Sequence, residues 1–207
     1  MFPVGGYERF LDKIKGRDVD GKETNVFGVL FADIDQPDAK SYILNYLDFF
    51  NENSSTYIDF YIPGYTNEDL HFYTEISNTI KINGKTYYFY RDIYNTFIKD
   101  FRLDFGINIP YTPSLLLMEY KNGNFNKAKF IEIDLDDGIN SVRRAGKLFD
   151  RIFEIAKDGG DVRIINNILE LDNLVDYFKT DFVDDLGIPL LTVGKKITER
   201  ISKFRLN

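Results

Sequence analysis

The segment 112–124, which reads TPSLLLMEYKNGN, limits most strongly how this 207-residue chain can fold. Pro113 has a fixed φ angle and no backbone N–H, so it is typical of a position where a strand begins. The apolar run after it has the length of a buried strand, and the Asn-Gly pair at 122–123 predicts a tight hairpin turn. We therefore expect a strand over 114–121 that turns back into an antiparallel strand over 128–135.

A second apolar run, 26–32, is typical of a central strand covered on both faces. Helical spacing over 39–51 and a strand-like run over 57–62 follow it. A strand, a helix and a strand of these lengths predict a βαβ unit with parallel strands. The remaining predicted elements are an N-terminal helix around 7–14, a hairpin at Asn83-Gly84, helices over 91–105 and 139–157, and helices near 162–179 and 195–205.

The composition restricts the chemistry of the chain. It contains no cysteine, which excludes disulfides, zinc-thiolate sites and cysteine nucleophiles. The formal charge of −7 would repel a phosphate backbone, so nucleic acid is not an expected partner. No apolar stretch approaches the roughly 20 residues that span a bilayer, and the start lacks the pattern of a signal peptide. We expect a cytoplasmic protein that acts without a membrane, and the oligomeric state is open.

The order of these elements and two short motifs resemble the thioredoxin family. The segment 112–124, preceded by Phe-Gly-Ile at 105–107, is similar to the proline loop, strand and hairpin of thioredoxins. Residues 31–38 read FADIDQPD where thioredoxins carry Cys-Gly-Pro-Cys between a strand and a helix. The resemblance covers residues 25–157. It implies a cis peptide at Thr112-Pro113 and a peptide-binding surface at the proline loop.

If the two prolines correspond, Asp35 and Asp38 occupy the cysteine positions. The resemblance then implies a redox-inactive, cysteine-free thioredoxin-like protein that binds another protein or a peptide and needs no cofactor. The candidate binding residues are Ile34, Asp35, Asp38, Tyr111, Thr112 and Pro113. Considered by themselves, carboxylates at a helix start predict capping, worth about 0.5–1 kcal/mol each.

A different class of function remains open, because Glu119-Tyr120-Lys121 resembles the Glu-x-Lys of metal-dependent nucleases. Spacing two places Glu119 and Lys121 on one face of a strand, and Asp104 upstream would complete such a site. The alternative function is therefore a metal-dependent hydrolase or nuclease. The simpler interpretation of the same residues is a solvated strand end.

We predict an α/β fold with a thioredoxin-like central mixed sheet flanked by helices. The expected organisation has three parts. Residues 1–24 form an N-terminal helix and turn, residues 25–157 form the thioredoxin-like domain, and residues 158–207 form a helical C-terminal extension. An insertion after the second strand of the domain, at 64–90, interrupts it.

Overall fold

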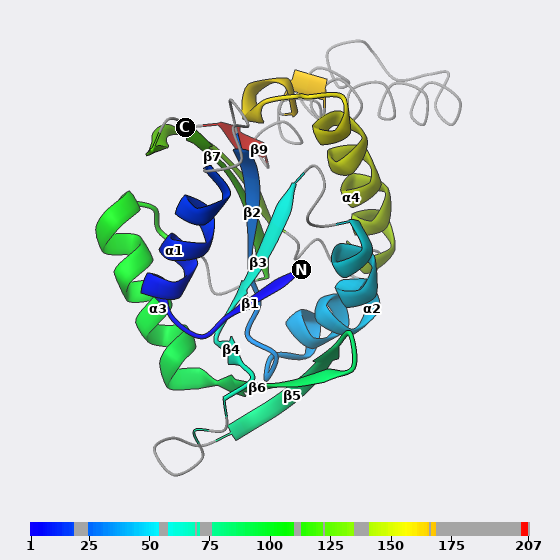
Figure 1. The fold of residues 1–207 in the computed structure, drawn as a ribbon. Coiled ribbons are helices and arrows are strands. Elements are labelled where there is room, and N and C mark those ends of the chain that lie inside the picture. The colour runs from blue at the N-terminus through cyan, green and yellow to red at the C-terminus, as the bar shows by residue number, and fades with distance from the viewer. Residues whose placement is uncertain are drawn as a thin grey trace, which may run out of the picture.

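A computed structural model of the chain describes residues 1–18, 25–53, 58–68, 70, 76–109, 113–121, 123–134, 141–165, 167–168 and 204–206. These residues form an α/β fold with a mixed main sheet, a small second sheet and helices on both faces of the main sheet (Figure 1). In chain order the elements are β1 (Phe2–Val4), α1 (Tyr7–Asp18), β2 (Asn25–Phe31), α2 (Pro37–Asn53), β3 (Asp59–Pro63), β4 (Tyr65–Thr66), β5 (Ile76–Ile82), β6 (Lys85–Tyr90), α3 (Arg91–Phe105), β7 (Ser114–Lys121), β8 (Asn124–Asp134), α4 (Ser141–Lys157) and β9 (Phe204–Leu206).

Strand β2 lies inside the main sheet, whose order is β1-β3-β2-β7-β8-β9. It pairs in parallel with β3 and antiparallel with β7. The predicted βαβ unit and the predicted central position of this strand are therefore confirmed. Strands β7 and β8 pair antiparallel around the turn at Gly123, as the Asn-Gly signal predicts. The short strand β1, which the sequence did not indicate, pairs in parallel with β3 at the edge of the sheet.

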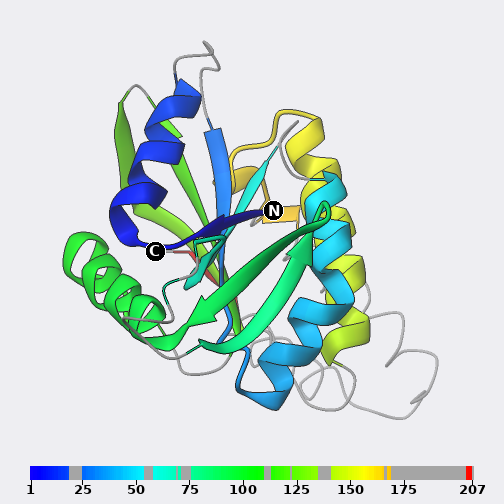
Figure 2. The same cartoon turned by 60° about the horizontal axis from the view of Figure 1, so that its bottom comes forward.

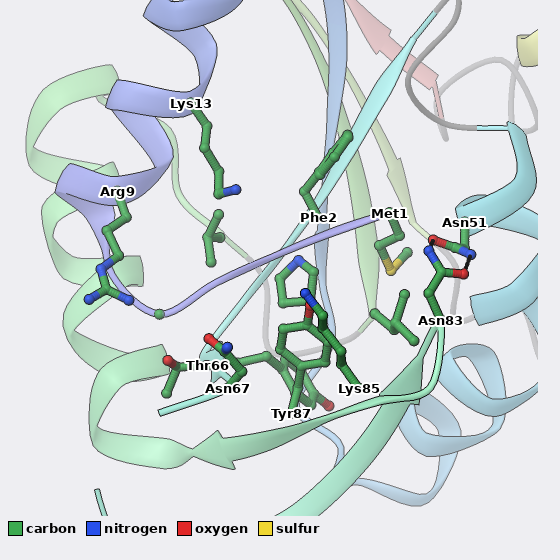
Figure 3. A pocket seen from close by; sticks show the side chains of 15 residues that line it. Met1, Phe2, Arg9, Lys13, Asn51, Thr66, Asn67, Asn83, Lys85 and Tyr87 are labelled. Carbon is green, nitrogen blue, oxygen red and sulfur yellow. Dashed lines mark hydrogen bonds between the residues drawn. The ribbon is translucent and has the colours of Figure 1, made fainter. Parts of the chain in front are cut away.

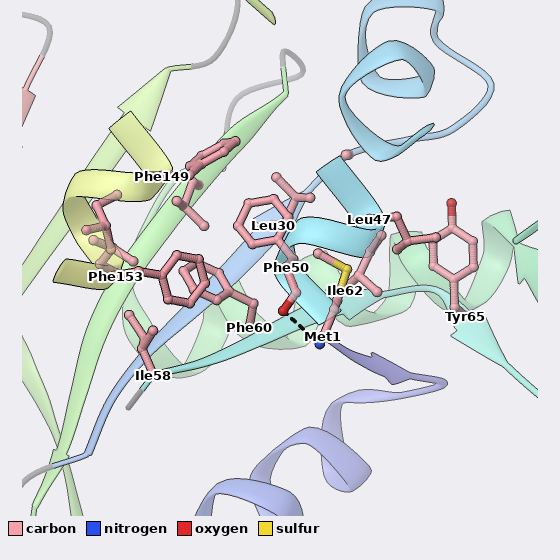
Figure 4. Close-up of a cluster of buried hydrophobic side chains, with 14 of the residues drawn as sticks. Met1, Leu30, Leu47, Phe50, Ile58, Phe60, Ile62, Tyr65, Phe149 and Phe153 are labelled. Carbon is pink, nitrogen blue, oxygen red and sulfur yellow. Dashed lines mark hydrogen bonds between the residues drawn. The ribbon is translucent and has the colours of Figure 1, made fainter. Parts of the chain in front are cut away.

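Helices cover both faces of the main sheet, with α1 and α3 on one side and α2 and α4 on the other (Figure 1). Side chains of β2 alternate between two hydrophobic clusters. Phe27, Val29 and Phe31 join the cluster under α1 and α3, whereas Val26 and Leu30 join the cluster under α2 and α4. In the second cluster, Phe50 of α2 and Phe153 of α4 pack on the ring of Phe60 from β3, and Phe149 of α4 packs on Phe50 (Figure 4).

The segment predicted to be an insertion, 64–90, contains the second sheet, with strand order β4-β6-β5. Its predicted hairpin is confirmed, because Asn83 and Gly84 form the turn between β5 and β6 and both have positive φ angles. Gly64 also has a positive φ, 86°, and redirects the chain from β3 into β4. Turning the molecule brings the hairpin forward, beside α2 (Figure 2). Asn51 at the end of α2 donates a hydrogen bond to Asn83 at 2.8 Å.

The predicted C-terminal helices are described only in part. Residues 162–165 and 167–168 are helical, as expected. Phe204–Leu206, at the end of the basic helix predicted near 195–205, is instead the strand β9, so that prediction was wrong for these residues. The strand pairs with β8, whose backbone groups would otherwise be an open sheet edge. Within the described residues, no helix combines the length and the apolar character needed to cross a lipid bilayer.

Candidate functional site

The loop from β2 to α2 and the residue before β7 lie side by side at one end of the main sheet. Phe31 of β2 pairs with Ser114 of β7. Continuing this antiparallel register by one residue brings Ala32 beside Pro113, and both residues are buried. Two stretches that are far apart in the sequence therefore meet where α2 begins. Tyr111, Thr112 and the predicted cis peptide bond before Pro113 lie outside the described residues.

Two carboxylates and one guanidinium surround this corner. The carboxylate of Asp33 accepts a hydrogen bond from the backbone N–H of Asp35 at 3.0 Å. The carboxylate of Asp35 forms an ion pair with Arg91, the first residue of α3, and Arg91 also lies 3.5 Å from the Asp33 carboxylate. The hydrogen bond to Asp35, followed by the charge of Asp33, raises the pKa of the Arg91 guanidinium.

This geometry adds an ion pair to Asp35, one of the two aspartates at the expected cysteine positions. Asp35 was predicted to cap the helix that follows, which stays a prediction, and its carboxylate also binds the side chain of Arg91 from α3. Arg91 therefore ties the start of α3 to the loop that leads into α2. Asp38 belongs to the first turn of α2, but its side chain lies outside the described residues, so its predicted capping role stays a prediction.

The inner side of the corner is apolar except for one hydroxyl. Ile34 is only 1% exposed and belongs to the core under α2, so it is not available for direct contact with a partner. The hydroxyl of Tyr65 is buried and has no hydrogen-bond partner within the described part of the chain. Burial, and then the charges of Asp33 and Asp35, raise the pKa of Tyr65, so its phenol is neutral. Of the described corner residues, Asp35 and Arg91 have charged side chains that reach the surface.

The residues of the alternative metal site do not come together. Glu119 alternates along β7 with Leu115 and Leu117, which face the helices α2 and α4. Asp104 lies on α3, which covers the opposite face, and accepts a hydrogen bond from the Tyr7 hydroxyl at 2.6 Å. The sheet therefore separates Asp104 from Glu119. Among the described residues, no group of three or more His, Asp or Glu side chains could hold a metal ion.

Glu119 has a position that neither sequence interpretation anticipated. It is 7% exposed, so it is not part of a solvated strand end, although Lys121 two residues later is exposed. Its carboxylate accepts a hydrogen bond of 2.8 Å from the backbone N–H of Val162, at the start of the helical segment after α4. A buried carboxylate that accepts the free N–H of a helix start acts as a cap supplied from a distant strand. This hydrogen bond gives Glu119 a structural role.

A pocket of about 440 Å³ lies at the β1 edge of the main sheet (Figure 3). Its wall combines β1, α1, the end of α2, β4 with the residue after it, and the β5–β6 hairpin. The polar residues that line it are Arg9, Lys13, Asn51, Tyr65, Thr66, Asn67, Asn83, Lys85 and Tyr87. Sequence reasoning missed this pocket because its residues are scattered over four segments. The hairpin signal at Asn83-Gly84 located one wall but not its neighbours.

Comparison with models of known protein families, with curated proteins and with solved structures finds no match to this chain.

Proposed function

We propose that this chain is a thioredoxin-like protein without thiol chemistry, and that it works by binding another protein or a peptide. The order β2, α2, β3, α3, β7, β8 and α4 agrees with the order that the sequence resemblance implies. The observation that carries the proposal is the register of β2 and β7, which brings Pro113 beside the entry into α2. In the family that the chain resembles, a peptide binds at this junction.

The side chains at the junction can bind a partner but cannot exchange disulfides. The chain has no cysteine, and the positions near the α2 entry carry carboxylates instead. The side chains of Asp35 and Arg91 are 24% and 51% exposed. Exposed carboxylates at this corner favour a peptide that brings a basic side chain, which could compete with Arg91 for Asp35.

A selection from a random-peptide display library, followed by titration of the selected peptide, tests the proposal. Asp35→Lys is the test variant, because it reverses the charge at the corner. Asp48→Lys is the matched control, because Asp48 is an exposed carboxylate in the later part of helix α2. We expect Asp35→Lys to weaken peptide binding at least about tenfold, which corresponds to 1.4 kcal/mol, and Asp48→Lys to leave it within about twofold.

NMR titration with the selected peptide shows whether the peptide binds at the corner. Amide resonances of Asp33, Asp35 and Arg91 should shift on titration, and those at the far end of α2 should not. The proposal fails if no library peptide binds above background. It also fails if the two charge reversals weaken binding equally, or if the shifts lie on another face of the molecule.

A further inference from the structure

We propose that the pocket at the β1 edge binds a small organic anion, with a phosphate or carboxylate group held by Lys13 and Lys85. Asp33, Asp35 and Pro113 of the corner do not line this pocket, whereas Tyr65, whose hydroxyl lies on the inner side of the corner, does. The inference uses neither Tyr65 nor the proposed peptide site. It rests on the charge of the lining, on the availability of its lysines and on the shape of its walls.

The sign of the charge in the pocket is opposite to that of the chain. The whole sequence carries a formal charge of −7. The residues that line the pocket nevertheless include Arg9, Lys13 and Lys85 and no aspartate or glutamate. Cationic side chains gathered in a concave, low-dielectric site focus their field and raise the local concentration of anions. An acidic chain that keeps this local excess of cations has a region suited to an anionic ligand.

Two of the three cations are available to a ligand. Arg9 forms an ion pair with Glu68 at 2.7 Å, so its charge is already balanced in part. The ammonium group of Lys13 lies 5.6 Å from the ring centroid of Phe2, a contact that leaves its hydrogen-bond donors free for an anion. Neither Lys13 nor Lys85 forms an ion pair with a carboxylate of the described residues. Figure 3 shows both side chains at the pocket, Lys13 from α1 and Lys85 from β6.

The remaining walls supply neutral groups and apolar surface. Asn51 and Asn83 close one end, where each amide donates to the other, at 2.8 Å and 3.5 Å. Phe2, Ile82 and Tyr87 add apolar and aromatic surface. A volume of about 440 Å³ lies within the range of small-molecule sites, roughly 300–1,000 Å³. Cations beside aromatic surface therefore favour an anion attached to a ring or another apolar body.

Phenyl phosphate, benzoate, inorganic phosphate and uncharged benzyl alcohol, titrated into the full chain by calorimetry and NMR, test this inference. We expect phenyl phosphate or benzoate to bind, benzyl alcohol not to bind, and inorganic phosphate to bind more weakly than phenyl phosphate. The comparison of phenyl phosphate with benzoate tells which anionic group the pocket prefers. Binding should weaken as salt is added, because exposed charges are screened.

Lys13→Ala and Lys85→Ala should each weaken binding of the preferred aryl anion about tenfold. Lys99→Ala, which removes an exposed lysine of α3 outside the pocket, should leave it unchanged. Lys13 and Lys85 are exposed, so both variants should keep the melting temperature of the parent. The inference is overturned if no aryl anion binds at millimolar concentration, if benzyl alcohol binds equally well, or if Lys99→Ala weakens binding as much as the two pocket variants do.

Discussion

At Gly28, in the middle of β2, the ring of Phe60 from the neighbouring strand β3 occupies the space that a side chain would need. A Cβ atom at this position would lie 2.5 Å from Cε1 and 2.6 Å from Cδ1 of the Phe60 ring. That ring cannot move aside easily, because Phe50 and Phe153 pack on it with centroid distances of 4.7 Å and 5.1 Å. Only glycine therefore fits between β2 and the phenylalanine cluster.

Gly28→Ala should destabilise the fold by about 1–3 kcal/mol, the usual cost of overpacking a filled core. Gly16→Ala is the matched control, since a Cβ atom there meets nothing within 4 Å. Gly16 lies in α1, where alanine should stabilise by about 0.5–1 kcal/mol. Urea unfolding of both variants gives the comparison. Equal stability of Gly28→Ala and the parent would show that Phe60 can repack.

At the scale of single residues, the sequence predicts those conformations that depend only on neighbouring residues. Asn83 and Gly84 adopt the positive φ angles of a hairpin turn because few other residues tolerate them. Asp35 and Glu119 were harder to interpret, because their partners Arg91 and Val162 are 56 and 43 positions away. No local pattern reports such distant partners, so the sequence did not indicate the ion pair of Asp35 with Arg91 or the burial of Glu119.

At the scale of elements, Glu119 joins strand β7 to the helical segment that follows α4. Glu119→Ala removes the acceptor and leaves the buried N–H of Val162 without it, which should cost about 1–3 kcal/mol. Glu119→Gln keeps an acceptor oxygen and should cost less. Hydrogen exchange at Val162 should accelerate in Glu119→Ala before global unfolding. If the two variants lose equal stability and the exchange rate does not change, this hydrogen bond does not hold the segment.

The elements that the sequence predicted are those with strong periodicity. The helix α3 has the predicted bounds 91–105, because Tyr94, Phe97, Phe101 and Phe105 repeat at helical spacing and Gly106 ends it in a left-handed conformation. The strands β1 and β9 have three residues each, too few for any periodicity, and depend on β3 and β8 for their hydrogen bonds. The corner was expected from the resemblance of residues 31–38 and 112–124 to thioredoxin motifs, whereas no motif marked the residues of the pocket beside β1.

At the scale of the whole molecule, the chain start is part of the core rather than a free tail. The amino group of Met1 donates a hydrogen bond of 3.2 Å to the backbone carbonyl of Phe50, at the end of α2 (Figure 4). Burial lowers the pKa of this amino group from 8.0 to about 5, and the charge of Asp59 opposes part of that change. The folded state therefore holds the amine neutral at neutral pH, whereas the unfolded state would protonate it.

This difference predicts a pH dependence with a definite sign for a chain that has a free Met1 amine. Between about pH 5 and pH 8 the unfolded state binds more protons, so stability should fall as the pH is lowered through that window. The slope should stay below the limit of about 1.4 kcal/mol per pH unit for one proton, because the amine is not fully desolvated.

An otherwise identical chain acetylated at Met1 keeps an N–H donor but cannot titrate. The difference between the unfolding free energies of the two forms cancels the titration of every other group, including the single histidine. It should grow as the pH falls from 8 to 5 and level off outside that range. Parallel curves for the two forms would mean that the amine is hydrated in the folded protein.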